Sequence, residues 1–574
     1  MVALHEPLDS ALREELSAYD ELVAGLLSRR GITSRAEAEA FMSPSYEAHL
    51  DDPLKMLNMP RAVTRIAKAI TEQEHITVWS DYDCDGIPGG VLLHDFLKKA
   101  KANFSNYIPH RHDEGYGVNV LGVEKLAREG TKVMITVDSG ITDVEAIGRA
   151  TELGIDVIVT DHHLPGETLP NAFAVIDPKQ KDETYPFRDF CGAGLAWKLA
   201  CGVLAHGFKG REDIPLGWEK WLLDMAGLAT IADMVPLVGE NRVIAKYGLL
   251  VMRKSPRVGL QKLCKIARID QRFITEEDVG FTIAPRVNAA SRMGTPRDAF
   301  ELFTTESEAR EEELAKELER ANRSRRSAAA AITRAVHERL EERKLQGVLP
   351  EVIALGNPEW RPSLLGLVAN TVSEEYERPV FLWGREGGEG LKGSCRAGVP
   401  HVSVVDLMEG VQNILHGYGG HRAAGGFSVK DSEIFNLEEQ LCRVFREKVT
   451  GGALPLFARA DAVLALRDAT NEALLRVSRL APFGIGNEKP VFAFRNVSLK
   501  TVSWFGKVQE HLKISVTSDG FDSVEGVAFY AKRELGPRVK QLTAGIDISI
   551  LASLERDQFT RGRPVRLRLV DISF

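Results

Sequence analysis

The sequence predicts a multidomain protein, mainly α/β: a doubly wound parallel sheet, then a long helix, a second α/β unit and a C-terminal β-barrel. Three observations predict this order. Strand-like and helix-like segments alternate from about residue 75, neither Gly nor Pro occurs in 305–346, and short alternating segments fill the chain from 455. The 574 residues also exceed one ordinary domain of roughly 100–200 residues.

The first part of the chain predicts short helices and then a parallel sheet. Residues 11–70 contain helical pieces joined by turn residues. After them, apolar and β-branched runs that end abruptly in polar residues predict strands at 75–80, 132–137, 155–160 and 173–176. Helical patterns lie between these strands, at 89–100, 123–130 and 143–154, and residues 218–300 look mainly helical. Such strand–helix–strand alternation is typical of a doubly wound sheet.

A single long helix is predicted after this sheet domain. Thr305 and Glu308 have the spacing of a capping box at its start. An apolar stripe at helical spacing follows, formed by Leu314, Leu318, Ala321, Ala328, Ile332 and Val336. At 1.5 Å per residue such a helix is roughly 60 Å long, so we expect it to connect domains rather than lie within a core.

The remaining chain predicts two further units. Residues 350–450 form an α/β pattern with a Gly-rich end, and the pattern from 455 onward suits a small barrel. The expected domains are an N-terminal helical extension at 1–50, the first α/β domain at 51–302, the connector helix at 303–346, the second α/β domain at 347–452 and the barrel at 453–574.

Composition excludes several classes of protein. Hydrophobic residues make up 44% and charged residues 27%, the balance of a soluble globular protein. Mean hydropathy is −0.14, and no apolar run approaches the roughly 18 residues that a membrane span needs. The acidic N-terminal stretch lacks the apolar core of a secretory signal. The six cysteines are scattered without a CxxC pair, so we interpret them as reduced, buried thiols.

Charge is unevenly distributed along the chain. The net charge of −8 by itself argues against a nucleic-acid partner. Residues 1–450, however, hold 55 Lys and Arg against 68 Asp and Glu, whereas residues 451–574 hold 18 against 13. The sequence therefore predicts an acidic body and a basic C-terminal domain.

Three of the predicted strands end in carboxylates or histidines. They run into Asp81-Tyr82-Asp83-Cys84-Asp85, Asp138-Ser139-Gly140 and Asp161-His162-His163. Open α/β sheets bind ligands outside the carboxyl ends of their strands, so the three turns should meet in one crevice. Two carboxylates about 4 Å apart repel by roughly 4 kcal/mol at an effective dielectric near 20. Cations are therefore expected there, and oxygen ligands with imidazole favour Mn²⁺ or Mg²⁺.

Each aspartate taken singly has a simpler explanation, as a helix cap or turn residue. Three acidic clusters at consecutive strand ends are hard to explain by capping alone, so the set favours a metal site. Asp233 is a further acid, at an otherwise apolar helical segment.

The ordered motifs D-x-D-x-D-G at 81–86, V-D-S-G at 137–140, D-H-H at 161–163 and A-D-M-V-P-L at 232–237 resemble the successive motifs of the DHH phosphoesterases. The resemblance extends from about Leu26 to the end of the chain. It includes the segments at 185–199, 239–242, 284–294 and 482–492. It implies that the three larger domains are a DHH catalytic domain, a DHH-associated substrate-binding domain and an OB-fold.

The resemblance also implies a two-metal site. Its metal ligands would be Asp83, Asp85, Asp138, His162 and Asp233, while Asp81, Asp161 and His163 complete the catalytic set. Two ions can activate a water molecule and stabilise the charge that develops on the phosphate during hydrolysis. The chain departs from the family at Ile87-Pro88-Gly89-Gly90, where hydroxyl residues are usual, and at Trp79-Ser80, where relatives carry Gly, sometimes after His. No expected carboxylate is missing, so we expect activity.

Substrate-binding residues follow from the same resemblance. In the catalytic domain they are Arg111, Tyr116, Arg286, Asn288 and Arg292; in the DHH-associated domain they are Ser394, Arg396, Gly419, Gly420 and His421. Arginine suits phosphate oxygens, although local ion pairs are the alternative for Arg286 and Arg292. An OB-fold binds single strands by aromatic stacking beside a basic groove. The aromatic candidates there are Trp504, Phe505, Phe521, Phe529 and Tyr530, and the basic candidates are Lys507, Lys513, Arg561, Arg563, Arg566 and Arg568. For each aromatic, a place in the barrel core is the favoured alternative.

The function implied is a metal-dependent exonuclease that degrades single-stranded DNA from its 5′ end to mononucleotides, in DNA repair and recombination. A cytoplasmic monomer is expected, with a single-strand-binding protein and a helicase as protein partners by resemblance. Two alternatives stay open: a DHH phosphodiesterase acting on short oligonucleotides, and a catalytically silent scaffold that binds single strands.

Overall fold

The computed structural model describes residues 3–4, 8–111, 113–347, 349–385, 390–399, 401–448, 459–506, 509–518, 523–531, 535–557, 560 and 564–574. The chain divides into two compact units. Unit 1 comprises residues 1–321, 458–528 and 540–574, and unit 2 comprises residues 322–457 and 529–539. Within the described ranges, no helix combines the length and apolar character needed to span a membrane.

Unit 1 begins with the short helices that the sequence predicts. They are α1 (Ser10–Glu15), α2 (Glu21–Ser28), α3 (Arg35–Met42) and α4 (Met59–Glu72). Ser34 and Glu37 form a capping box at α3, which fixes its start. A two-residue strand, β1 (Ala3–Leu4), pairs in parallel with β12 (Arg459–Ala460), so the start of the chain meets the segment before the barrel.

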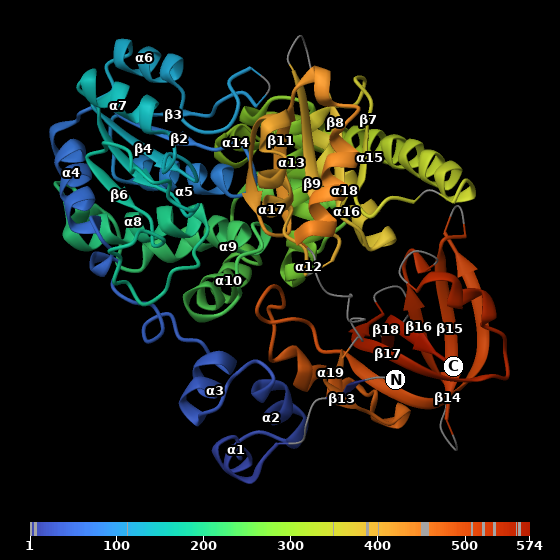
Figure 1. Ribbon diagram of the computed structural model, residues 1–574. Coiled ribbons are helices and arrows are strands. Elements are labelled where there is room, and N and C mark those ends of the chain that lie inside the picture. The colour runs from blue at the N-terminus through green and yellow to red at the C-terminus, as the bar shows by residue number, and fades with distance from the viewer. Residues whose placement is uncertain are drawn as a thin grey trace. The chain divides into compact units, whose positions relative to one another are not determined.

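A five-stranded parallel sheet lies at the centre of the first α/β domain. Its strand order is β3 (Phe104–Tyr107), β2 (Ile76–Ser80), β4 (Val133–Val137), β5 (Asp156–Thr160) and β6 (Ala174–Ile176). Figure 1 shows α6 (Val120–Arg128) and α7 (Val144–Glu152) on one side of this sheet, with α5 (Gly86–Lys99) and α8 (Gly192–His206) on the other. The doubly wound prediction is confirmed. Strand β3 was not predicted, because its short sequence Phe-Ser-Asn-Tyr is mixed in polarity and only half-buried.

A helical layer completes the domain. It contains α9 (Leu223–Ala232), α10 (Gly239–Met252), α11 (Val258–Ala267), α12 (Glu276–Asp278), a π-helical turn (Val279–Ile283), α13 (Ala284–Met293) and α14 (Pro296–Thr304). Side chains from α4, α5, α8 and α9 form one continuous core with the sheet. The helical prediction for 218–300 is thereby confirmed.

The long helix α15 (Glu308–Leu345) begins later than its predicted capping box. Thr305 is the C-cap of α14, and the next helix begins three residues later, at Glu308. The Ser307 hydroxyl instead accepts from Arg310 N at 3.4 Å, in the position of the N-cap. Leu314 and Leu318 are buried in the core of unit 1, and the division between the two units falls at residues 321–322, inside the helix.

Unit 2 contains a second, mixed sheet. Its order is β10 (Leu415–His421), β11 (Ala424–Val429), β9 (Leu391–Arg396), β8 (Val380–Gly384) and β7 (Ile353–Gly356), and only β7 and β8 are parallel. Helices α16 (Pro362–Tyr376), α17 (Val404–Gly410) and α18 (Leu437–Lys448) accompany it.

All six cysteines of the protein are free thiols, and all except the half-buried Cys201 are buried, as predicted.

The C-terminal region is a closed barrel of five strands. The strands are β14 (Phe492–Phe505), β15 (His511–Thr517), β16 (Val524–Ala528), β18 (Val565–Ser573) and β17 (Asp547–Arg556), and β17 pairs back onto β14. The short β13 (Ala462–Val463) pairs with β14, and α19 (Asn471–Ser478) precedes the barrel. Phe492 and Phe494 are fully buried in its interior. The barrel prediction is confirmed.

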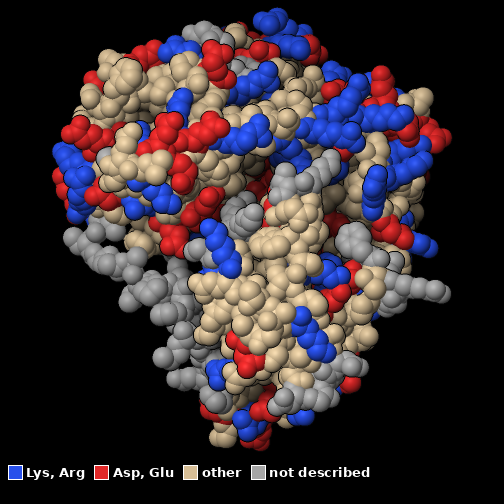
Figure 2. All heavy atoms as spheres, turned by 90° about the vertical axis from the view of Figure 1, so that its right-hand side faces the viewer, with Lys and Arg blue, Asp and Glu red and all other residues tan. Residues whose placement is uncertain are grey.

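Two of the basic candidates of the barrel pair with acidic side chains. Arg566 donates to Glu555 Oε1 at 2.6 Å and Asp557 Oδ1 at 3.3 Å, and Lys513 lies 2.7 Å from Glu525 Oε1. These two cations therefore have partners within the barrel. In the lower half of Figure 2, where the barrel is seen, charged side chains are scattered over a mostly uncharged face.

Four of the five candidate stacking aromatics of the barrel are among the described residues. Trp504, Phe505 and Phe529 are partly buried and Tyr530 is 45% exposed, so none of these four is fully buried. Arg568 is half-buried on β18. Lys507, Phe521, Arg561 and Arg563 lie outside the described residues.

Two family-like segments without a predicted role meet in unit 1. Arg242, in α10, donates to the carbonyl oxygens of Phe41 at 2.7 Å, Leu480 at 2.9 Å and Ala481 at 3.2 Å. Its guanidinium also lies 3.7 Å from the centre of the Phe41 ring, and burial lowers the pKa of Arg242 to about 9. Asn487 accepts from Arg30 at 2.5 Å and donates to Leu480 O at 2.8 Å. The N-terminal helices, the first α/β domain and the segment before the barrel are thus joined.

Candidate active site

The parallel register brings the predicted acidic turns to one edge of the sheet. Ser80 is paired with Val137, and Val137 with Thr160, so β2, β4 and β5 end at the same level. The next residue of each strand is an aspartate: Asp81, Asp138 and Asp161. Asp138 has a φ of 60°, a left-handed conformation that non-glycine residues adopt rarely and that is found at functional sites.

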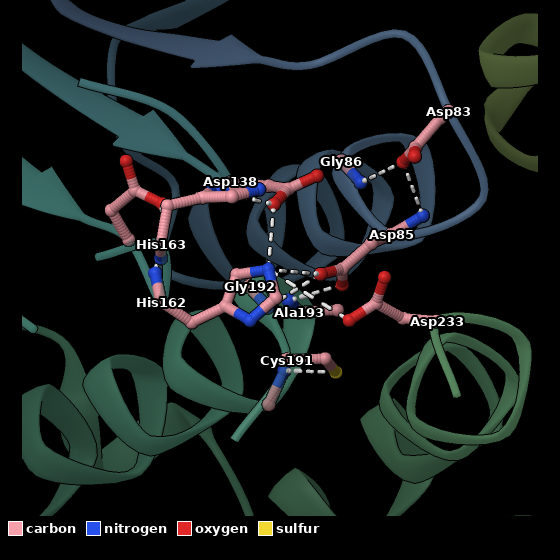
Figure 3. A network of polar contacts seen from close by, with 12 residues as sticks. Asp83, Asp85, Gly86, Asp138, His162, His163, Cys191, Gly192, Ala193 and Asp233 are labelled. Carbon is pink, nitrogen blue, oxygen red and sulfur yellow. Dashed lines mark hydrogen bonds and ion pairs between the residues drawn. The ribbon is translucent and has the colours of Figure 1, made fainter. Parts of the chain in front are cut away.

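His162 lies at the centre of the cluster. Its Nε2 atom is 3.1 Å from Asp138 Oδ1, 3.6 Å from Asp85 Oδ2 and 3.8 Å from Asp233 Oδ2. Figure 3 shows these three carboxylates pointing toward the imidazole from different parts of the chain. Three groups have all their ligand atoms within 4.8 Å of one another: Asp138, His162 and His163; Asp85, His162 and Asp233; and Asp81, Asp83 and Asp138.

The start of α8 holds Asp85 in place. Gly192 N donates to Asp85 Oδ2 at 2.6 Å, and Ala193 N donates to Oδ1 at 2.7 Å. The free amides and positive dipole end of a helix stabilise a carboxylate there. Residue 192 must be small, because a Cβ atom on it would lie 2.5 Å from Asp138 Cβ.

The first acidic turn is ordered by its own side chains and by α13. Asp83 Oδ1 accepts from Asp85 N at 2.8 Å and from Gly86 N at 3.2 Å. Asn288 Oδ1 accepts from Cys84 N at 2.9 Å. Asn288, predicted to bind substrate, therefore supports the turn that carries two of the predicted ligands.

The buried carboxylates of the cluster repel one another, and bound cations would offset this repulsion. Burial, followed by repulsion from neighbouring carboxylates, raises the pKa of Asp81, Asp138 and Asp233 well above the ordinary value. The same causes raise the pKa of Asp85 to about 7. Asp81 Oδ1 is buried, and none of the described residues hydrogen-bonds it. The donor set of carboxylate oxygens and imidazole fits Mn²⁺ or Mg²⁺.

The two histidines differ in surroundings. Burial and the neighbouring His163 lower the pKa of His162 to about 3, which keeps its imidazole in the neutral form that binds metals. His163 Nδ1 lies 2.8 Å from Asp161 Oδ1; burial opposes protonation, but this contact raises its pKa overall. Asp161 also accepts from the backbone of Ile141 at 2.9 Å. Asp161 thus holds His163 and the loop, without belonging to any of the three ligand groups.

The predicted substrate residues of the catalytic domain fall into two sets. Tyr116 donates to Asp138 O at 3.1 Å and lies 3.2 Å from His163 Nδ1, while Arg111 is 4.8 Å from the centre of the Tyr82 ring, beside the acidic turn. Arg286 is different. Its Nε donates to Glu319 Oε2 at 2.8 Å and both side chains are largely buried, which favours the alternative of a local ion pair. Burial raises the pKa of Tyr82 to about 12, and the nearby Arg111 opposes this rise.

The two departures from the family pattern, Trp79-Ser80 and Ile87-Pro88-Gly89-Gly90, are sterically compatible with each other. A Cβ atom at Gly90 would lie 2.5 Å from Ser80 Oγ, and one at Gly89 would lie 2.5 Å from Val137 Cγ1. The Ser80 hydroxyl thus occupies the space that a side chain at residue 90 would need. The two changes therefore compensate for each other, and neither removes a carboxylate.

The predicted phosphate-binding residues of unit 2 lie on neighbouring strands. Ser394 and Arg396 share one face of β9, close to Gly366 of α16. Gly419, Gly420 and His421 lie on β10, which pairs with β11, and β11 pairs with β9. A Cβ atom at Gly419 would meet open space, and Gly420 has a φ of 140° that favours glycine. Burial lowers the pKa of Arg396.

Sequence reasoning missed the backbone amides of Gly192 and Ala193. The segment Cys191-Gly192-Ala193-Gly194 opens helix α8, which was not predicted, and a helix start presents free amides. It also missed Asp177, which follows β6 and is fully buried. Burial raises the pKa of Asp177 to about 7. The strand before it was predicted at 173–176, but the single aspartate that follows was not counted with the three acidic strand ends.

Comparisons with known families match three parts of the chain. The model of the DHH family N-terminal domain matches residues 75–230, that of the DHHA1 domain matches residues 347–449, and that of the RecJ OB domain matches residues 460–571. The first match contains all the strand-end residues described above.

Curated and solved relatives cover most of the chain. The single-stranded-DNA-specific exonuclease RecJ of Bacillus subtilis (strain 168) is 33% identical over 96% of this chain and 67% of its own. The crystal structure of RecJ in complex with Mn²⁺ from Thermus thermophilus aligns with a TM-score of 0.80 and 26% identity, covering 100% of this chain and 79% of that one. The Mg²⁺ complex of RecJ from the same organism has the same fold, with a TM-score of 0.75, 24% identity and coverage of 100% and 78%. With the three ordered domains and the crevice at the strand ends, these likenesses place the chain in the RecJ family of DHH phosphoesterases.

Proposed function

We propose that the crevice of unit 1 hydrolyses phosphodiester bonds of single-stranded DNA with two divalent cations, removing mononucleotides from the 5′ end. The observation that carries this proposal is the cluster at the strand ends, where His162 and Asp138 each belong to two of the three groups of potential ligands. Their raised pKa values mean that the carboxylates favour either protons or cations. The likeness to single-stranded-DNA-specific exonucleases supports the choice of substrate.

The residues of the crevice then have distinct roles. Asp83, Asp85, Asp138, His162 and Asp233 hold the cations, as expected from the sequence. Asp161 fixes the orientation of His163. Asp81 has a buried oxygen, Oδ1, and belongs to the ligand group of Asp83 and Asp138. Bound cations lower the pKa of a coordinated water and offset the charge that develops on the phosphate. The amides of Gly192 and Ala193 orient Asp85 and favour its ionised form, in opposition to the burial that raises its pKa.

Recognition of the 5′ end is assigned to the DHH-associated domain. Ser394, Arg396 and His421, with the backbone of Gly419 and Gly420, would bind the terminal phosphate, since glycines allow an anion close to backbone amides. Arg111 and Tyr116 would bind the phosphate next to the cations. In this division of roles, catalysis belongs to residues 51–302, binding of the 5′ end to residues 347–452 and binding of the single strand to residues 453–574. A cytoplasmic monomer, with a single-strand-binding protein and a helicase as partners, belongs to the same proposal.

A labelled-strand assay tests the proposal. A 5′-labelled and a 3′-labelled single strand are incubated with Mn²⁺, Mg²⁺ or EDTA, beside a duplex of the same sequence. We expect metal-dependent release of the 5′ label first, as a mononucleotide, with the duplex largely spared. Equal attack on both ends, or activity confined to di- and trinucleotides, would contradict the proposal. The latter result would favour the short-oligonucleotide phosphodiesterase.

A substitution separates catalysis from binding. In Asp138→Ala the shared member of two ligand groups is lost, so cleavage should be abolished while the affinity for single strands stays close to wild type. Retained turnover would show that the cations bind elsewhere. Absence of turnover in the wild-type protein with both metals, alongside strand binding, would favour the silent scaffold.

A further inference from the structure

Phe281 is a large apolar side chain that the fold leaves in solvent. It lies in the π-helical turn Val279–Ile283 and is 83% exposed. Its neighbours Val279 and Ile283 are both fully buried, so the turn itself is packed firmly while this one ring points outward. π-Helical turns are rare and occur frequently at functional sites.

The ring shares a helical face with a residue that contacts the acidic turn. The turn runs directly into α13, and positions 281, 285, 288 and 292 recur at the spacing of one helix face. Pro285, Asn288 and Arg292 are partly exposed, whereas Val287 and Ala290, on the other side of the helix, are buried. This partly exposed face is called the α13 stripe below.

One contact joins the α13 stripe to the crevice. Asn288 accepts from the backbone of Cys84, between Asp83 and Asp85. The C-terminal part of the stripe therefore lies against the acidic turn, and Phe281 lies at the opposite end. Seven residues separate Phe281 from Asn288, which corresponds to roughly 10 Å along a helix.

We propose that Phe281 is a stacking platform for a base of the substrate strand, within about three nucleotides of the bond that is cut. This inference rests on the proposed function and adds a binding position to it. With about 3.4 Å between stacked nucleotides, 10 Å spans roughly three of them. A base is the fitting occupant because aromatic rings bind single strands by stacking without sequence preference. The position would bind a strand of several nucleotides and would not reach a dinucleotide.

The test compares long and short substrates in the full-length protein with saturating Mn²⁺. The probes are a 5′-phosphorylated 12-nucleotide strand and a 5′-phosphorylated dinucleotide. In Phe281→Ala we expect the ratio of kcat/KM for the 12-mer to kcat/KM for the dinucleotide to fall about tenfold, through KM for the 12-mer. Phe281→Trp should restore the ratio, because indole stacks at least as well. Phe273→Ala is the matched control, since Phe273 is also exposed, at 61%, but lies outside the α13 stripe.

An abasic scan locates the contact. Single abasic sites at each of the first five positions should weaken wild-type binding most at one position, and Phe281→Ala should lose the penalty at that position alone. An unchanged substrate ratio in Phe281→Ala, or an equal fall in Phe273→Ala, would overturn the inference, as would a scan with no position dependent on Phe281. Phe281→Ala should keep the wild-type melting temperature, because the ring is exposed. Failure of the wild type to release the 5′ label would instead refute the proposed function.

Discussion

Gly192→Ala is the sharpest test of how α8 supports the crevice. The added Cβ would lie 2.5 Å from Asp138 Cβ and 2.9 Å from Asp138 Cα. Because carbon atoms prefer separations of about 3.5–4.0 Å, the start of α8 and the Asp138 turn must move apart by about 1 Å. Both are backbone-anchored, so no side-chain rotation relieves the contact. Overpacking of this kind costs about 1–3 kcal/mol of unfolding free energy.

The same movement affects catalysis more than stability. The amides of Gly192 and Ala193 donate to Asp85 at 2.6 and 2.7 Å, and a shift of about 1 Å breaks or bends both bonds. A displacement of this size in a catalytic group can lower turnover about 100-fold. We therefore expect a fall in kcat of that order, with weaker apparent affinity for Mn²⁺.

The assay measures kcat for 5′-label release across a Mn²⁺ titration, together with the urea unfolding curve. Gly194→Ala is the matched control in the same helix, since its Cβ would lie 3.5 Å from the nearest atom, Phe190 Cδ1, an ordinary contact. That variant should keep wild-type turnover and be equally or slightly more stable. Wild-type kcat and metal affinity in Gly192→Ala would refute the role given to the start of α8.

Three further predictions concern stability. Arg242→Ala removes the donor of three buried carbonyl bonds and should lower the unfolding free energy by about 3 kcal/mol in urea denaturation; a loss below about 1 kcal/mol would contradict the role of this arginine. Gly90→Ala should cost about 1–3 kcal/mol, and adding Ser80→Gly should recover most of it in a double-mutant cycle, whereas additive effects would show that the two departures are independent. In EDTA the raised pKa of Asp85, about 7, means that the folded carboxyl keeps a proton that the unfolded one has lost, so stability falls as pH rises from about 4 to 7. Mn²⁺ should accordingly raise the melting temperature more at pH 8 than at pH 5.5, and equal shifts at both pH values would contradict this.

The sequence indicated the metal crevice well because its signals are local. Asp81, Asp138 and Asp161 each follow an apolar strand, and the parallel register alone brings them to one edge. Predicting the strands therefore predicted which side chains would meet, without knowledge of packing.

Contacts that depend on three-dimensional packing could not be found in this way. The pairing of Arg286 with Glu319 joins two helices 33 positions apart, and nothing in either segment distinguishes a partner carboxylate from a substrate phosphate. Ser307 replaced Thr305 as the N-cap because α14 extends to Thr304, a boundary that the helical pattern does not mark. The site that receives the Arg242 guanidinium is formed by backbone oxygens, which carry no sequence signal.

The contact between Arg30 and Asn487 has a consequence for synthesis of the chain, because 457 positions separate the two residues. At roughly 5–20 residues added per second, about 20–90 s pass between their appearance on the ribosome. During that time the buried faces of α2 and α10 lack the segment that later covers them. Residues 480–488, made late in synthesis, thus complete contacts with residues made early. Removing residues 455–574 to test the barrel would also take away the acceptors of Arg242, so point substitutions are the cleaner experiment.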